Sequence, residues 1–520
     1  MAHSHPMATD LVELERRLWA AADELRANSN LTATQYRDPV LGLIFLAFAE
    51  QRFDAARDEV ESAAGRRRRP GPDDYQARGV LYVASEARLS TIAKVPEGSD
   101  TGGLLNRAMR AIERDNPELA GVLPQVYARL GKSTLVELIR LLAPLTDSVE
   151  GDAFGLIYEY FLAAFAMQEG RGGGEFFTPA SIVSLLVEVI EPYHGRILDP
   201  ACGSGGMFVH SAKFVNRHKR DAASELSVYG CELKEITLPL AKMNLALHGL
   251  GGDIVEANSY YEDPHSAAGR FDFVLANPPF NVDKVDKSRL DGDRRYRFGL
   301  PKADNANYLW IQLFWSALNP HGRAGFVMAN SAADARSSEL EIRRKLVETC
   351  TVDVIIAVSS NFFYTVTLPV TLWFFDKAKA RGPRHDEVLF IDARHTYHQV
   401  DRAHRDFTPA QIEFLANIVR LWRGDEIEDT AGSPPLLAEH FPDERYTDVP
   451  GLCKAATIAD IKAQGWSLNP GRYVGTSTTD DNHEDFVQKM AVLYEEFTAL
   501  STKAAKLTKK VDVVMRELLE

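Results

Sequence analysis

Short apolar runs alternate with helical segments over the middle of this chain, and this alternation constrains the fold more than any other feature. Strand-like runs lie at 196–198, 227–229, 254–255, 271–276, 324–329, 352–358 and 370–375. Helices fit between most of them, for example at 181–190, 236–248 and 308–318. This order predicts an α/β fold with a doubly wound sheet. Residues 388–392 are expected to add an edge strand.

The strand at 271–276 ends in Asn277-Pro-Pro-Phe280. Two consecutive prolines cannot continue a strand or enter a helix interior, so the chain stops where open α/β sheets place their ligands. The Asn277 side-chain carbonyl and the Pro278 main-chain carbonyl are two acceptors for an exocyclic amino group, and Phe280 can stack on the attached ring. The sequence therefore indicates group transfer to an amino nitrogen. A strand followed by a plain proline turn is the structural alternative.

A glycine-rich turn, Asp199-Pro-Ala-Cys-Gly-Ser-Gly-Gly206, follows the strand at 196–198 and precedes a predicted helix at 207–215. Glycines let the main chain approach a ligand closely, and a helix N-terminus attracts an anionic group. This position favours a nucleotide-like cofactor. Glu232 follows the second strand, where an acid reaches ribose hydroxyls; otherwise it is a solvated acid at a helix start. Asn258 follows the third strand and is either an adenine contact or an ordinary polar loop residue.

The segment Glu175-Phe-Phe-Thr-Pro179 stands just before the predicted sheet. Its aromatic rings, hydroxyl and proline can form one wall of a cofactor pocket. Thr178 is also a candidate N-cap, with Pro179 as the first helical residue. The two roles are compatible.

The first 150 residues are predicted to be helical, with Val40–Ala47 as a buried helix after Pro39. The run Arg66–Arg69 is either a solvated loop or a phosphate contact. Gly131-Lys-Ser-Thr134 lacks the first glycine of a phosphate-binding loop. Thr134–Glu137 is therefore predicted to be a capping box that starts a helix.

The C-terminal part is predicted to contain a linker and a long helix. Residues 426–480 are expected to form the linker and a C-terminal segment, and 481–520 a single helix. Apolar residues in that helix recur in steps of four and three at Phe486, Met490, Leu493, Phe497, Leu500, Ala504, Leu507, Val511, Val514 and Leu518. This heptad seam favours pairing with a helix of another chain over packing on its own domain.

Composition limits the class of protein. In 520 residues, 45% apolar and 25% charged side chains predict a soluble globular protein of several compact units. No apolar run approaches ~20 residues and no signal peptide is recognisable, so a cytoplasmic protein without a membrane span is expected. The four scattered cysteines form no CxxC pair, which disfavours disulfides and a zinc site. A net charge of -14 suggests that a partner supplies much of any DNA contact.

The order of these boxes closely resembles the amino-methyltransferases that use S-adenosylmethionine. In finer detail the chain resembles the modification (M) subunits of type I restriction–modification systems. The supporting strings are Phe154–Tyr160, Gly174–Pro179, Asp199–Gly206, Ala276–Asn281, Ile342-Arg343, Phe390–Arg394 and Leu468–Val474. The segment Asn330–Arg336 departs from the family because it lacks the expected glycine-rich turn. The resemblance implies a helical N-terminal domain (1–150), a Rossmann-like methyltransferase domain (151–425), the segment 426–480 and a C-terminal coiled-coil helix (481–520).

The resemblance also implies site-specific methylation of adenine N6 in DNA, without a metal. It assigns the cofactor S-adenosylmethionine to Glu175, Phe176, Phe177, Thr178, Pro179, Asp199, Ala201, Cys202, Gly203, Gly205, Glu232 and Asn258. It assigns a flipped adenine to Asn277, Pro278, Pro279 and Phe280. The implied partners are double-stranded DNA, a specificity subunit docked through the C-terminal helix and the N-terminal domain, a second copy of the chain, and a restriction or translocase subunit. A protein glutamine or RNA adenine acceptor, and a scaffold with a decayed pocket, are the alternative functions.

Overall fold

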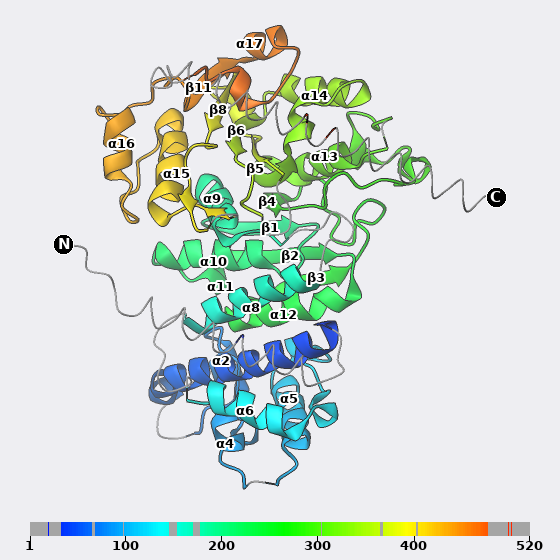
Figure 1. Ribbon diagram of the computed structural model, residues 1–520, viewed down its shortest axis with the longest axis vertical. Coiled ribbons are helices and arrows are strands. Elements are labelled where there is room, and N and C mark those ends of the chain that lie inside the picture. Colours follow the sequence, from blue (N-terminus) through cyan, green and yellow to red (C-terminus); the bar gives the residue numbers. More distant parts are fainter. Residues whose placement is uncertain are drawn as a thin grey trace.

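A computed structural model describes residues 33–64, 68–96, 98–144, 153–169, 177–302, 304–363, 368–401 and 404–476, together with Trp19, Thr498 and Ser501. A helical region built around α2 (Ala33–Ala64) occupies the lower part of Figure 1, and a large α/β region lies above it. None of the helices in these ranges is long and apolar enough to cross a membrane. The predicted heptad seam, Glu175 and Phe176 all lie outside the described residues.

The α/β region is organised around a large, mostly parallel sheet. In the described part of the chain, nine strands lie in the order β11-β8-β6-β7-β5-β4-β1-β2-β3. Their bounds are β1 (Gly195–Asp199), β2 (Leu226–Glu232), β3 (Gly252–Glu256), β4 (Phe271–Ala276), β5 (Leu318–Ala329), β6 (Val352–Val358), β7 (Val370–Asp376), β8 (Glu387–Asp392) and β11 (Cys453–Thr457). Strand β7 runs antiparallel to β5 and β6, and β11 antiparallel to β8; the other pairs are parallel. The predicted doubly wound fold and its seven strands are confirmed.

Helices cover both faces of this sheet. On β7, Leu372 and Phe374 face one apolar core, whereas Trp373 and Phe375 face another, as the two-residue period of a strand requires. The first core is shared with α9 (Ala180–Ile190), α10 (Gly206–Arg217) and α15 (Pro409–Arg423). The second is shared with α13 (Asn307–Ala317), α14 (Ser338–Glu348) and α17 (Ile458–Ala463). Every residue of β6 and β7 is buried, and both strands are mostly apolar apart from Asp353, Thr371 and Asp376.

The strand order reverses between β1 and β4. From β1 the chain proceeds through β2 to β3 on one side, and from β4 through β5 on the other. Ligands in open α/β sheets bind outside the carboxyl ends of the strands at such a switch point. Here those two strand ends carry Asp199 and, directly after β4, Asn277.

The N-terminal region packs against the sheet domain through α12 (Leu238–Leu247). Leu240, Met243 and Leu247 of α12 join the apolar core of α2, and the Arg52 guanidinium donates to the Leu247 carbonyl. The helices of this region are α2 (Ala33–Ala64), α3 (Pro72–Gln76), α4 (Leu89–Ile92), α5 (Thr101–Asp115) and α6 (Lys132–Leu142), followed by α8 (Ala153–Glu169). Val40–Ala47 is helical and buried as predicted, although Pro39 lies inside α2 rather than before it.

Some sequence predictions are wrong in detail. Strand β8 is not an edge strand, because β6 and β11 pair with its two sides. Thr134–Glu137 is not the start of a helix, because α6 begins at Lys132 with Gly131 as its N-cap. Thr178 is not an N-cap either: Pro179 holds that position, without a side-chain cap. The helix predicted at 236–248 is shorter and follows a 3₁₀ turn at Glu235–Thr237.

The segment predicted as a linker joins the sheet domain instead. After α16 (Pro434–His440), β11 extends the sheet and α17 packs on its face. Leu468 is fully buried, and Tyr473 stacks on Phe390 of β8 at 3.9 Å between ring centroids. Proline and acidic residues between these short elements gave the sequence its linker-like composition. In the Arg66–Arg69 run, the Arg68 guanidinium donates to both carboxylate oxygens of Asp74. This ion pair within the protein makes Arg68 a less suitable phosphate contact.

Candidate active site

A cavity of about 310 Å³ opens at the carboxyl ends of β1, β2 and β4. It brings together the two halves of the predicted site. The predicted residues that line it are Phe177, Thr178, Asp199, Ala201, Cys202, Gly203, Glu232, Asn258, Asn277 and Pro279. Four other predicted residues do not line it, namely Pro179, Gly205, Pro278 and Phe280. The cavity therefore joins the glycine-rich turn to the box that follows β4.

The glycine-rich turn is fixed by main-chain hydrogen bonds to two acids. The Asp199 carboxylate accepts from the Ala201 amide at 2.9 Å, and the Glu232 carboxylate accepts from the Gly203 amide at 3.0 Å. The second oxygen of Glu232 accepts from the Lys234 amide at 2.9 Å. Gly205, the N-cap of α10, has a φ of +78°, which glycine adopts without steric cost. The turn thus holds its shape while exposing Gly203 and Ser204 to the cavity.

Electrostatics favour a cationic ligand at this end. Asp199 is 1% exposed, and burial raises the pKa of its carboxyl to about 8, with the nearby Glu232 charge acting in the same direction. A positive group beside these acids would stabilise their charged forms. Burial also raises the pKa of the Cys202 thiol well above its usual range, so the thiol keeps its proton where it lines the cavity.

The acceptor end is organised by Asn277. Its Nδ2 donates a hydrogen bond to Thr178 Oγ1 at 2.8 Å, which fixes the orientation of the side-chain amide. Pro279 lines the cavity beside it, and Pro278 is buried. Phe280 departs from expectation: its ring is only 5% exposed and belongs to the apolar core beneath α9 and α10. In this conformation the ring faces the protein interior.

Several cavity residues were missed by sequence reasoning, among them Tyr260, Val282 and Trp310. Trp310 and Tyr260 lie with ring centroids 4.7 Å apart, and Val282 lies just after the acceptor box. Trp310 belongs to the strongly apolar helix α13, so its sequence context indicates core packing alone. Tyr260 stands two residues after Asn258, where its aromatic character was the available signal.

Comparison with known proteins agrees with this geometry. The sequence profile described as N-6 DNA Methylase matches residues 149–482, and that described as HsdM N-terminal domain matches residues 14–142. The chain belongs to the N-6 DNA methylase family. The MjaIX type I restriction enzyme methylase subunit of Methanocaldococcus jannaschii is 35% identical, over 100% of this chain and 93% of that protein. The HindI methylase subunit of Haemophilus influenzae is 35% identical, over 81% and 95% respectively.

A solved structure shares the fold of this methylase. The type I restriction–modification methyltransferase subunit of Streptococcus thermophilus superposes with a TM-score of 0.68 at 20% identity, covering 90% of this chain and all of that one. The resemblance drawn from the sequence is therefore confirmed. The protein is an adenine-specific DNA methyltransferase of the type I modification-subunit group.

Proposed function

We propose that this methylase transfers a methyl group from S-adenosylmethionine to N6 of adenine in double-stranded DNA, at sites selected by a separate specificity subunit. The observation that carries the proposal is the single cavity that joins Asp199 and Glu232 to Asn277. Cofactor and target base can then meet at the switch point of the sheet.

The residues of the first half suit S-adenosylmethionine, which supplies an activated methyl group on a sulfonium. Asp199 and Glu232 provide negative charge for its cationic groups and acceptors for its ribose hydroxyls. The glycine-rich turn permits close approach, and Asn258 can meet the adenine edge. Phe177 and Leu233 offer apolar surface; Leu233 is 58% exposed at the cavity. Glu175 and Phe176 belong to the same proposed binding set.

The residues of the second half suit an amine that is a poor nucleophile because its lone pair is delocalised into the ring. Asn277 Oδ1 and the Pro278 carbonyl would accept its two protons and favour a pyramidal nitrogen. S-adenosylmethionine held beside Asp199 and Glu232 would supply the activated methyl group, and Asn277 and the Pro278 carbonyl would hold the amine, which loses one proton to solvent. Alignment of the two reactants supplies most of the rate, without a metal.

The target base must leave the duplex to enter this cavity. We assign Phe280 to stacking on the extruded adenine. Because its ring is buried in the present conformation, this role requires it to turn out of the core when the base enters.

The proposed assembly follows from charge and from the family. A chain with a net charge of -14 gains from a partner that neutralises phosphates. We propose docking of the specificity subunit to the helix predicted at 481–520 and to the N-terminal domain, with a second copy of this chain and a restriction or translocase subunit completing the cytoplasmic assembly. A solved structure that addresses complex assembly and conformational transition of the type I restriction–modification system shares the fold, with a TM-score of 0.57 at 19% identity.

The test is Asn277→Ala in the assembled complex. Methyl transfer to DNA should fall below detection, while calorimetry should show S-adenosylmethionine binding within a few-fold of wild type. An equal loss of methyl transfer and of S-adenosylmethionine binding would place Asn277 in the cofactor site and contradict its assignment to the target amine. Single-molecule sequencing of DNA from cells that express the complex, with and without the specificity subunit, identifies the modified base and its dependence on that partner.

A further inference from the structure

Asn281, the residue directly after the acceptor box, has an unusual backbone. Its φ is +55°, in the left-handed region that residues other than glycine rarely adopt. Asparagine tolerates this region better than most residues, but the conformation persists only where neighbouring groups hold it. The contacts of Asn281 therefore show what fixes the end of the box.

The buried side chain of Asn307 holds Asn281 through two reciprocal hydrogen bonds. The Asn281 amide donates to Asn307 Oδ1 at 2.9 Å, and Asn307 Nδ2 donates to Asn281 Oδ1 at 2.9 Å. Asn305 Nδ2 adds a third bond to Asn281 Oδ1 at 3.1 Å. The Ala306 amide donates to the Val282 carbonyl at 3.0 Å. Asn307 is 2% exposed, so its polar atoms lie where an unmade hydrogen bond is costly.

Asn307 is the first residue of α13, and this helix is a rigid support. Leu309, Ile311 and Phe314 are fully buried in the core on one face of the sheet. The Tyr308 hydroxyl donates to the Ala332 carbonyl at 2.7 Å. Trp310, on the same helix, lines the cavity. A residue anchored on α13 is therefore fixed relative to both the sheet and the proposed cofactor pocket.

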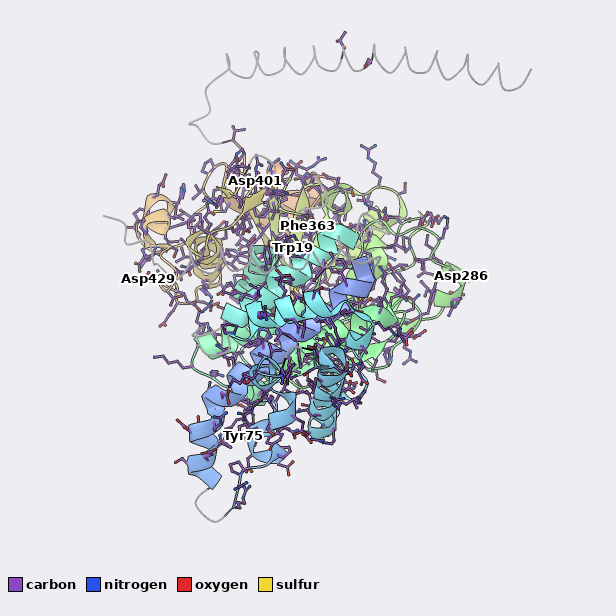
Figure 2. All side chains as sticks on the ribbon, turned by 60° about the horizontal axis from the view of Figure 1, so that its bottom comes forward. Trp19, Tyr75, Asp286, Phe363, Asp401 and Asp429 are labelled. Carbon is purple, nitrogen blue, oxygen red and sulfur yellow. The ribbon has the colours of Figure 1, made fainter. Side chains whose placement is uncertain are left out.

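The Asn281–Asn307 pair also closes the neck of a long excursion. Between these residues the chain carries two short 3₁₀ turns, Lys287–Leu290 and Arg294–Tyr296, and its Leu290 and Tyr296 side chains are buried in the core that contains α13. Figure 2 places Asp286, within this excursion, at the outer edge of the molecule. The Asn281–Asn307 bonds therefore join the two ends of this excursion beside the acceptor box.

We propose that Asn307 is a positioning residue for methyl transfer. Through Asn281 it holds the acceptor box at the angle at which Asn277 and Pro278 meet the target amine. This inference rests on the proposed function and adds a residue outside the cavity to it. A displacement of about 1 Å in such a site can cost about 100-fold in rate.

The test compares single-turnover methylation by the assembled complex, at saturating cofactor and DNA, with cofactor affinity and melting temperature. Asn307→Ala should lower the rate about 10- to 100-fold and leave S-adenosylmethionine affinity within about three-fold. Asn307→Asp keeps the acceptor for the Asn281 amide and should recover part of the rate. The double variant Asn281→Gly with Asn307→Ala should be no slower than Asn307→Ala alone, because both changes remove the same interaction.

Asn319→Ala is the matched control. Asn319 Nδ2 donates to Asp272 Oδ1 at 2.6 Å, at the end of β4 opposite Asn277. Its loss should lower the melting temperature without slowing transfer. A wild-type rate for Asn307→Ala, or a loss of rate matched by a loss of cofactor affinity, overturns the positioning role. If Asn277→Ala itself retains activity, the proposed function fails instead, so the two failures are distinct.

Discussion

Asn277 Nδ2 lies 2.8 Å from Thr178 Oγ1, so the tip of β4 is bonded to the segment that precedes α9. The hydroxyl accepts from the amide nitrogen, and Oδ1 therefore lies on the other side of the amide carbon. The hydrogen bond to Thr178 therefore stops the Asn277 amide from rotating and sets the direction in which Oδ1 can accept from a ligand.

Thr178→Val should remove this control. The valine side chain has nearly the same shape but offers no acceptor, so the amide can rotate, and methyl transfer should fall by about 10-fold, equivalent to about 1.4 kcal/mol. Thr178→Ser keeps the hydroxyl and should stay near wild type. Steady-state methylation with tritiated S-adenosylmethionine measures both. Equal rates for the valine and serine variants would show that the bond has no part in transfer.

The raised pKa of Asp199 predicts a pH-dependent stability. In the folded protein without ligand the carboxyl has a pKa of about 8, against an ordinary value of 3.8. Between pH 3.8 and about 8, Asp199 therefore keeps a proton in the folded state that it has lost in the unfolded state. The stability that this proton contributes is full at low pH and is lost as pH rises through about 8. Asp199→Asn has no such proton, so its melting temperature should rise relative to wild type between pH 5 and pH 9.

The same group makes cofactor binding pH-dependent. A cationic ligand beside Asp199 lowers the pKa of its carboxyl, so binding at pH 7 should release a proton. Calorimetry in buffers of different ionisation enthalpy measures this release, and Asp199→Asn should abolish it. An unchanged proton count in that variant would assign the release to another group.

Residues fixed by the sheet could be predicted from the sequence, and residues fixed by tertiary hydrogen bonds could not. Every residue of strands β6 and β7 is buried, so their largely apolar sequences indicate directly that both strands lie inside the sheet. Asp199 and Asn277 follow such strands, and the parallel topology brings strand ends together. The hydrogen-bond partner of a side-chain amide or hydroxyl often lies on an element distant in sequence. The bond between Thr178 and Asn277 and the bond between Asn307 and Asn281 were therefore missed.

Short elements held by main-chain bonds were also missed. Strand β11 has the sequence Cys-Lys-Ala-Ala-Thr, which has little apolar character. It joins the sheet because its main chain pairs with β8 from Cys453↔Ile391 to Thr457↔Glu387. The segment forms a strand because the edge of β8 is available for main-chain pairing. The side-chain pattern of β11 gives no sign of that pairing.

Alanine variants of Gly203 and Gly205 in the glycine-rich turn can distinguish the effect of backbone strain from the effect of a lost ligand contact. Gly203 and Gly205 both have positive φ, at +53° and +78°, so alanine at either position costs about 1 kcal/mol in backbone strain. A Cβ at Gly203 meets no atom within 4 Å, and this residue lines the cavity. Gly203→Ala should therefore also weaken cofactor binding, about 10-fold or more, whereas Gly205→Ala should mainly lower the melting temperature. Similar affinities in calorimetry would show that the ligand does not pass over Gly203.

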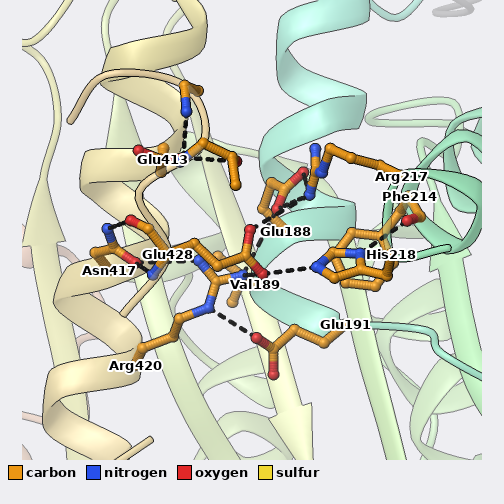
Figure 3. A network of polar contacts seen from close by, with 12 residues as sticks. Glu188, Val189, Glu191, Phe214, Arg217, His218, Glu413, Asn417, Arg420 and Glu428 are labelled. Carbon is orange, nitrogen blue, oxygen red and sulfur yellow. Dashed lines mark hydrogen bonds and ion pairs between the residues drawn. The ribbon is translucent and has the colours of Figure 1, made fainter. Parts of the chain in front are cut away.

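Arg420 of α15 lies at the centre of the polar network in Figure 3. Its side chain is 2% exposed and donates to Glu191 at 2.8 Å, to Glu428 at 3.0 Å and to Asn417 at 3.1 Å. These bonds join α15 to the end of α9. Removing one partner of a buried ion pair leaves uncompensated charge and costs about 3–5 kcal/mol. Arg420→Met should therefore lower the melting temperature strongly.

Arg344→Met on α14 is the natural comparison, because Arg344 pairs with Glu341 and Glu348 on an exposed helix face. Such pairs contribute little, so its melting temperature should change only slightly. The deficit of Arg420→Met should also shrink toward pH 5. Burial raises the pKa of the neighbouring Glu188 carboxyl, which lies 3.6 Å from Arg420, and a protonated acid no longer needs the cation. Differential scanning fluorimetry at pH 5 and pH 8 measures both effects. Equal losses for the two variants would show that the network around Arg420 contributes no more than a surface ion pair.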